Sequence, residues 1–157
     1  MSTPVTIAPL SQHQPLLPLV ADWFVAEWPA WYGPGGRGDL WADLHAFAAA
    51  DGALPVGVLA FRDGRAVGAA ALKAESIASH RHLSPWAAAG YVLPELRGQG
   101  IGAALLVGLV ATARAMGHAT VYCGTRSARS LLLRSGWQAI DSTLMEGEPL
   151  TVFRSPA

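Results

Sequence analysis

Residues 92–103 read Val-Leu-Pro-Glu-Leu-Arg-Gly-Gln-Gly-Ile-Gly-Ala, and they stand between a predicted strand and a predicted apolar helix. Gly98, Gly100 and Gly102 leave the backbone bare, so it can approach an anion closely. The first N–H groups of the following helix have no partner within it, and the helix dipole gives them a partial positive charge. Arg97 can add a charge-assisted hydrogen bond to the same anion. The stretch therefore predicts a phosphate-binding turn.

Two other interpretations of this glycine-rich stretch compete with the phosphate turn. The spacing Gly98-x-Gly100-x-x-Ala103 also satisfies the glycine fingerprint of dinucleotide-binding Rossmann enzymes. In those enzymes the turn follows its strand directly, whereas residues 94–97 intervene here, and no acidic residue ends the next strand at 121–123 to hold a ribose. The third interpretation is a turn that only packs a helix against a strand. A P-loop is excluded because no Gly-Lys-Ser/Thr follows.

Composition narrows the class of protein around this turn. The 157 residues suit one domain spanning 1–157. Hydrophobic residues make up 52% and charged residues 14%, which excludes intrinsic disorder. Eleven basic and eleven acidic residues cancel, so the basic excess typical of nucleic-acid binders is missing. No polybasic stretch favours a membrane surface either. We therefore expect neither nucleic acid nor membrane as a partner.

Cysteine usage and the N-terminal sequence predict the compartment. Cys123 is the single cysteine, so neither an intramolecular disulfide nor a cysteine-rich zinc site can form, and no metal is expected. Residues 1–10 lack the basic and apolar regions of a signal peptide. We expect a cytoplasmic protein, and its apolar surplus makes a homodimer plausible.

Periodicity and turn signals predict an alternating order of elements around a mixed sheet. Strands are expected at 5–10, 55–62, 66–72, 85–92, 119–123, 137–145 and 150–154, and helices at 14–28, 39–50, 100–116 and 128–134. Residues 29–38 are rich in glycine and proline and predict a loop. Asp63-Gly64 predicts a two-residue hairpin. The expected fold class is α/β (α+β) in a single domain.

A family resemblance enters at the same turn. Arg97-Gly98-Gln99-Gly100-Ile101-Gly102 resembles the pyrophosphate-binding loop of the GNAT superfamily of acyl-CoA-dependent N-acyltransferases. The resemblance covers nearly the whole chain in the order of one branch of that family and is tightest from 84 to 137. It implies a mixed, mostly antiparallel sheet of six or seven strands, splayed between the strands ending at Val92 and Cys123, with about four flanking helices.

The resemblance also implies where a coenzyme lies. Acetyl-CoA, as co-substrate, would occupy the opening between the splayed strands. Its pantetheine would pair with the backbone near Tyr91 and Val92. Its pyrophosphate would sit on the loop residues Arg97, Gly98, Gln99, Gly100, Ile101, Gly102 and Ala103. Residues 84–157 would then form the coenzyme half and residues 1–83 the acceptor half.

Acyl transfer to an amine needs a base, because only the neutral amine attacks a thioester. Glu75 is the candidate, since it follows the strand 66–72 on the side where the acceptor would approach; the competing interpretation is a solvated loop carboxylate. His80 and His82 have suitable chemistry, but they fall in a polar, irregular segment and are expected at the surface.

One position departs from the family pattern. The family often places a tyrosine, as the acid that protonates the departing thiolate, where this chain has Leu132. The thiolate can leave unaided, Cys123, Ser130 or Tyr122 can replace the tyrosine, or the protein can bind acyl-CoA without turnover.

The predicted acceptor pocket rests on aromatic residues in the first half. Trp31 and Tyr32 fall in the Gly/Pro loop, where aromatic side chains are harder to explain by core packing. Aromatic rings with nearby carboxylates suit a cationic amine. The expected function is transfer of an acetyl group from acetyl-CoA to a primary amine of a small molecule. The alternative is a non-catalytic acyl-CoA-binding or sensing module.

Overall fold

Strands and helices are mixed along the whole chain. The computed structural model describes residues 4–157, so the first three residues of the expected domain 1–157 lie outside it. The strands are β1 (Thr6–Pro9), β2 (Val56–Arg62), β3 (Arg65–Lys73), β4 (Trp86–Val92), β5 (Tyr122–Thr125), β6 (Gln138–Met145) and β7 (Glu148–Arg154). The α-helices are α1 (Leu17–Glu27), α2 (Pro29–Tyr32), α3 (Leu40–Phe47), α4 (Ile101–Ala115) and α5 (Arg129–Arg134). Short 3-10 turns lie at Leu10–Gln12, Gln14–Leu16, Ala78–His80 and Pro94–Leu96.

The strands form a seven-stranded sheet in the order β1-β2-β3-β4-β5-β7-β6. Every neighbouring pair is antiparallel except β4 and β5, which are parallel. This confirms the predicted mixed, mostly antiparallel sheet. The described chain has five α-helices where about four were expected, because residues 29–32, predicted as loop, form the helical turn α2. Pro29 at the first helical position needs no N–H donor there, which explains how a Gly/Pro-rich segment begins a helix.

The hairpin between β2 and β3 confirms the turn signal in the sequence. Asp63 and Gly64 have φ values of 53° and 74°, both in the left-handed region. A two-residue loop with both central residues left-handed matches the right-handed twist of the flanking strands. Arg62 and Arg65 therefore face each other across the end of the hairpin.

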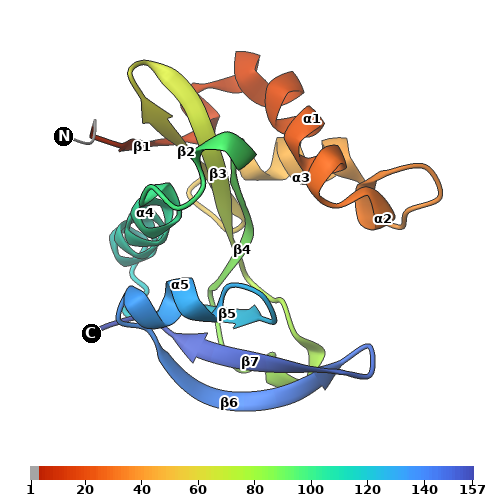
Figure 1. Ribbon diagram of the computed structural model, residues 1–157, viewed down its shortest axis with the longest axis vertical. Helices are drawn as coiled ribbons and strands as arrows, with labels where there is room; N and C mark the ends of the chain where they lie inside the picture. The colour runs from red at the N-terminus through yellow and green to blue at the C-terminus, as the bar shows by residue number, and fades with distance from the viewer. Residues whose placement is uncertain (1–3) are drawn as a thin grey trace.

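The sheet opens between its two parallel central strands. β4 and β5 are paired only where Trp86 meets Tyr122, and the Tyr122 N–H donates to the Pro85 carbonyl at 3.0 Å. Beyond that point the two strands run apart (Figure 1). The predicted splay is confirmed, although β5 begins later than expected. Val121 instead pairs with Ser155, whose hydroxyl accepts from the Val121 N–H at 2.9 Å.

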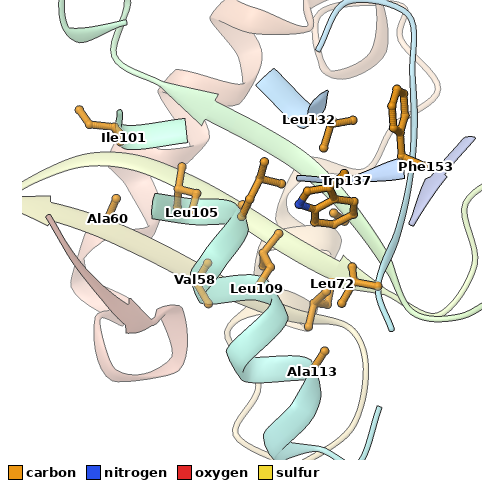
Figure 2. Packing of buried hydrophobic residues seen from close by; sticks show 14 of the residues in the cluster. Val58, Ala60, Leu72, Ile101, Leu105, Leu109, Ala113, Leu132, Trp137 and Phe153 are labelled. Atoms are coloured by element: carbon orange, nitrogen blue, oxygen red, sulfur yellow. The ribbon is translucent and has the colours of Figure 1, made fainter. Parts of the chain in front are cut away.

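Helices cover both faces of the β1–β4 part of the sheet (Figure 1). On one face α4 buries Ile101, Leu105 and Leu109 against residues of β2 and β3 such as Val58 and Leu72 (Figure 2). On the other face α1 and α3 bury a second apolar cluster with alternate residues of the same strands. Because side chains alternate across a strand, the neighbouring residues Tyr91 and Val92 of β4 pack into opposite clusters. The glycine-rich turn connects the end of β4 to the start of α4.

Candidate active site

Two left-handed glycines shape the turn between β4 and α4. Gly98 has a φ of +79° and Gly100 a φ of +88°, a region that residues with a Cβ rarely adopt. Gly100 is the N-cap of α4, and no side chain in the described part of the protein caps this end. The first helical hydrogen bond is the one from the Ala104 N–H to the Gly100 carbonyl, at 3.1 Å. The preceding N–H groups of α4 therefore point out of the helix at its positive end and form an anion cradle.

Space around these glycines distinguishes their roles. A Cβ at Gly98 or Gly100 would meet no heavy atom within 4 Å, so neither glycine is required by packing. A Cβ at Gly102 would lie 3.1 Å from Leu131 Cδ2. Close packing of helix against helix thus accounts for Gly102, whereas Gly98 and Gly100 are needed for backbone conformation. The space over the first turn of α4 is open, as a bound phosphate requires.

Arginines of the β2–β3 hairpin hold the loop from one side. The Arg62 guanidinium donates through Nη1 to Gln99 Oε1 at 2.7 Å. Arg65 pairs with Glu95 at 3.5 Å. The Oε1 atom of Gln99 is therefore engaged by Arg62, and the contact of Gln99 with an anion stays a prediction.

Arg97 has three partners within the protein. Its Nε donates to the Val92 carbonyl at 2.9 Å, and its Nη2 donates to Glu27 Oε2, at the end of α1, at 3.0 Å. Its guanidinium carbon also lies 5.6 Å from the centre of the Tyr91 ring, a cation–π distance. The contact between Arg97 and a pyrophosphate stays a prediction. The observed contacts tie the glycine turn to α1, and hence to the half of the chain expected to receive the acceptor.

The free edge of β4 carries a bulge. Ala69 pairs with Tyr91 and Ala71 pairs with Ala88, so Ala89 and Gly90 together oppose one residue of β3. Ala89 has a φ of +53°, a strained value for a residue with a side chain. Bulges of this kind re-aim backbone groups beside active sites. Since β5 has already turned away from β4, the bulge places N–H and C=O groups at the opening.

Tyr91 and Val92 can reach a ligand only through their backbone. The Tyr91 side chain is buried and stacks on Trp23 of α1, with ring centres 5.2 Å apart. Val92 is half-buried, and its carbonyl is the acceptor for Arg97. Their predicted role in binding pantetheine was a backbone role, and the geometry is compatible with it.

The opposite wall of the opening offers few proton donors. Leu132 is 1% exposed and packs beside Trp137 and Phe153, in the core (Figure 2). Cys123 on β5 is half-buried, and its burial raises the pKa of the thiol to about 11. Ser130 on α5 is exposed, and the Tyr122 ring lies 5.8 Å from Trp86. No prediction about which of them protonates the thiolate is decided by these positions.

Glu75 lies at the other end of β4 from the glycine turn. It belongs to the segment 74–85 that joins β3 to β4, whereas residues 97–103 follow the end of β4. A seven-residue strand spans roughly 20 Å. The Glu75 side chain is 64% exposed and pairs with Arg81 at 3.9 Å. The structure does not bring Glu75 into contact with the cradle, and its role as the base stays a prediction.

The two predicted acceptor aromatics have different surroundings. The Tyr32 hydroxyl donates to Asp43 Oδ2 of α3 at 2.7 Å, and its ring stacks on Phe24. Burial, followed by the hydrogen bond to Asp43, raises the pKa of Tyr32. Trp31 is 48% exposed and packs over Gly38. Tyr32 thus fastens α2 to α3, whereas Trp31 is available to a ligand.

The burial of His80 was not predicted from the sequence. His80, expected at the surface with His82, is only 7% exposed, and Asp141 of β6 binds its ring at 2.7 Å. The two residues are 61 positions apart, so no local pattern could have joined them. His82 is exposed as expected.

Within residues 4–157, no group of three or more His, Cys, Asp or Glu side chains lies close enough together to hold a metal ion. None of the helices described there has the length and apolar character needed to span a bilayer.

The splayed sheet with a glycine turn at the start of α4 defines the class of acyl-CoA-dependent acyltransferase folds. The family described as "Acetyltransferase (GNAT) family" matches residues 18–136, which is more than half of the chain. The chain therefore belongs to the GNAT acetyltransferase family. No curated protein is similar enough in sequence to count as a match.

Solved structures share the fold at low sequence identity. An aminoglycoside 6'-N-acetyltransferase complexed with coenzyme A is 14% identical, with a TM-score of 0.76 and 96% of each chain covered. The aminoglycoside 6'-N-acetyltransferase from Enterococcus faecium is also 14% identical, with a TM-score of 0.74 and 96% of each chain covered. The yncA protein from Salmonella typhimurium, solved with acetyl-CoA, is 18% identical; its TM-score is 0.71, and the match covers 96% of this chain and 92% of that one.

Proposed function

We propose that this protein transfers an acetyl group from acetyl-CoA to a primary amine of a small molecule, by direct attack of the amine on the thioester. One observation carries the proposal: the left-handed pair Gly98 and Gly100 opens the first turn of α4 at the mouth of the splayed strands. That arrangement fits a pyrophosphate followed by an extended arm. Membership of the GNAT family supports the same chemistry.

In this proposal the coenzyme is held mainly by backbone groups. The pyrophosphate accepts hydrogen bonds from the turn formed by residues 97–103, above all from the first N–H groups of α4. The pantetheine arm lies along the open edge of β4 at Tyr91 and Val92. Residues 84–157 bind the coenzyme, and residues 1–83 contribute most of the acceptor side.

The thioester supplies an activated acetyl group, and the chain's own task is to position and polarise it. A backbone N–H at the bulge of β4, at Ala89 or Gly90, can donate to the thioester carbonyl oxygen as negative charge develops there. Holding the amine against the carbonyl carbon removes much of the entropic cost of a reaction between two molecules. Such a site has no need of a covalent enzyme intermediate.

The acceptor side favours a small cationic amine. Trp31 exposes an aromatic face on α2, and Glu27 and Asp43 place carboxylates on the neighbouring helices. A ring and a carboxylate together suit an ammonium group before it loses its proton. Two of the similar structures carry the name aminoglycoside acetyltransferase, and aminoglycosides are polyamines of this kind.

Leu132 favours a second candidate, a non-catalytic acyl-CoA-binding module. In the core this side chain has no proton to give to a departing thiolate. A thiolate is nevertheless a tolerable leaving group, since thiol pKa values are modest. We therefore rank acetyl transfer first.

Turnover with a panel of primary amines tests the proposal. The protein is mixed with acetyl-CoA and, in turn, 2-phenylethylamine, spermidine and kanamycin, and free thiol is followed over time. Acetyl transfer predicts amine-dependent thiol release and addition of one acetyl group to the amine by mass spectrometry. Tight binding of acetyl-CoA without product from any amine would favour the binding module instead.

A further inference from the structure

A chain of hydrogen bonds crosses from the segment between β3 and β4 to the edge strand β6. His80 Nδ1 lies 2.7 Å from Ser79 Oγ, and His80 Nε2 lies 2.7 Å from Asp141 Oδ2. Ser79 Oγ in turn lies 3.3 Å from Thr143 Oγ1. Both nitrogens of a buried imidazole are thus engaged, one by a carboxylate and the other by a hydroxyl.

The carboxylate fixes the direction of every proton in this chain. An ionised Asp141 can only accept, so His80 carries its proton on Nε2. Nδ1 is then a bare acceptor, and the Ser79 hydroxyl must donate to it. Ser79 has no second proton, so Thr143 is the donor in their contact. A lone pair on Ser79 Oγ is left to accept a hydrogen bond from a ligand.

Burial and charge around His80 favour this polarity. The His80 side chain is 9% exposed, and the Asp141 side chain is 54% exposed. The hydrogen bond from His80 is the main cause that holds the pKa of Asp141 below its ordinary value. The other ionisable groups here are His82, whose ring lies 5.8 Å away, and the pair Arg81–Glu75 in the same segment. Asp141 is the charge that directly meets the imidazole.

The backbone around His80 is fixed. The His80 N–H donates to the Ile77 carbonyl at 3.0 Å, and the Leu83 N–H donates to the His80 carbonyl at 3.1 Å. Trp86 Nε1 donates to the Leu83 carbonyl at 2.7 Å, which joins the segment to the first residue of β4. The hydrogen-bond chain is therefore a defined part of the fold.

The hydrogen-bonded residues Ser79, His80 and Asp141 lie on the face of the sheet away from α4. Leu72 pairs with Ala87, and both belong to the layer under α4, so Lys73 and its partner Trp86 point to the opposite face. Trp86 there forms a small apolar cluster with Ile77, Leu150 and Val152.

Strand pairing gives the distance between these hydrogen-bonded residues and the opening of the sheet. The Ile77 side chain packs against Gly124 of β5, and β5 is one wall of the opening. Gly124 pairs with Val152 and Val152 with Asp141, so Asp141 lies two strand spacings, roughly 10 Å, from that wall.

We infer that Ser79, His80 and Asp141 form the proton relay that deprotonates the acceptor amine, an inference that rests on the proposed function. Ser79 Oγ contacts the amine, His80 receives the proton, and Asp141 holds the imidazole and the imidazolium. Glu75, five residues earlier in the same segment, is exposed and paired with Arg81, and it has no comparable partner.

The step balances without another reactant. The nitrogen lone pair forms a bond to the carbonyl carbon, the C–S bond breaks, and its electron pair leaves with sulfur. The amine proton passes to Ser79 Oγ while the Ser79 hydroxyl proton passes to His80 Nδ1. Water then carries the extra proton from the imidazolium to the thiolate, which restores neutral His80 and gives the free thiol.

Kinetics of four proteins against pH test the relay: wild type, Ser79→Ala, His80→Gln and the matched control His82→Gln. kcat/KM is measured from pH 5.5 to 9.5 with acetyl-CoA and whichever amine of the panel above reacts fastest. A base of this kind contributes about 100-fold or more, so Ser79→Ala and His80→Gln should lose about that factor. The wild-type rate should fall on the acid side of the profile, as general-base catalysis requires, and His80→Gln should lose this fall. His82→Gln should stay within about twofold of wild type, because His82 is exposed and takes no part in the relay.

Two further readouts separate the relay from a structural role. The acetyl-CoA dissociation constant should be unchanged in Ser79→Ala, whose side chain is exposed and whose folding is not at stake. In the ligand-free protein, long-range 1H–15N NMR of the His80 ring should show the proton on Nε2. A proton on Nδ1, an acid-side fall of the rate retained in His80→Gln, or a 100-fold loss in His82→Gln would each overturn the relay. Wild type that acetylates no amine would overturn the proposed function and the relay with it, whereas normal turnover in both Ser79→Ala and His80→Gln would overturn the relay alone.

Discussion

The two loops that lead into and out of β4 present different chemical groups, side chains in the first and backbone N–H groups in the second. The loop after β4, residues 93–100, presents backbone N–H groups and is shaped by two left-handed glycines. The loop before β4, residues 74–85, presents side chains, and its central contact joins His80 to a residue 61 positions away. A backbone site is therefore encoded within one stretch of sequence, whereas a side-chain site is assembled only when the sheet forms.

The largest effect is expected when the loop after β4 loses its backbone freedom. Gly100→Val places a β-branched side chain at a φ of +88° and crowds the cradle. Misplacing two N–H donors to a charged group should weaken acetyl-CoA binding by about 100-fold or more. Calorimetry of acetyl-CoA binding measures this, with circular dichroism to check the fold.

Gly117→Val is the matched control for that variant. Gly117 follows the other end of α4, has a φ of +95°, and likewise has no atom within 4 Å of an added Cβ. Both variants should lose about 1–2 kcal/mol of folding free energy, since both force a left-handed conformation. Equal loss of coenzyme affinity in the two variants would show that strain alone, and not the cradle, is responsible.

The reactivity of the Cys123 thiol shows whether the wall formed by β5 adds an ionisable group to those of the loop before β4. Burial raises the pKa of this thiol from 9.0 to about 11. At pH 8 its thiolate population should be about 100-fold smaller than that of an ordinary cysteine, because each unit of pKa is a factor of ten. Alkylation by iodoacetamide should be about 100-fold slower in the native protein than in urea. Equally fast labelling would identify Cys123 as a second reactive group in this wall.

Glu27 tests the side-chain contact that joins the loop after β4 to α1, through Arg97. Arg97 is held by Glu27 across a half-exposed pair, a contact worth about 0.5–1 kcal/mol. If the pyrophosphate competes for Arg97, Glu27→Gln should bind acetyl-CoA about two- to fivefold more tightly, measured by the same calorimetry. Weaker binding would mean that Glu27 positions Arg97 rather than competing for it.

The smallest expected effect is that of Asp141→Asn on the pH dependence of folding stability. Its pKa in the folded protein is lowered, chiefly by the hydrogen bond from His80. A lowered pKa stabilises the folded state above the ordinary value of 3.8, and this stabilisation disappears as the pH falls through the folded value. Thermal unfolding between pH 6 and pH 2.5 should show this acid loss in wild type and less of it in Asp141→Asn. Identical pH profiles would remove Asp141 from the stability of this loop.

Sequence reasoning recovered those features that depend on local chemistry. The hairpin at Asp63-Gly64 and the glycine turn followed from residues close together in the chain, whereas the splay of the sheet was implied by the family resemblance. The helical turn α2 was missed because proline at a first helical position looks like a loop signal. The burial of His80 was missed because its partner is fixed by the ladder of β6 and β7, which no local pattern reports.

Titration calorimetry of the wild-type protein determines whether the turn at residues 97–103 holds acetyl-CoA. We expect acetyl-CoA to bind with a dissociation constant on the order of micromolar, at one molecule per chain, and NAD not to bind. Binding of NAD without binding of acetyl-CoA would instead show that the glycine turn is a dinucleotide site.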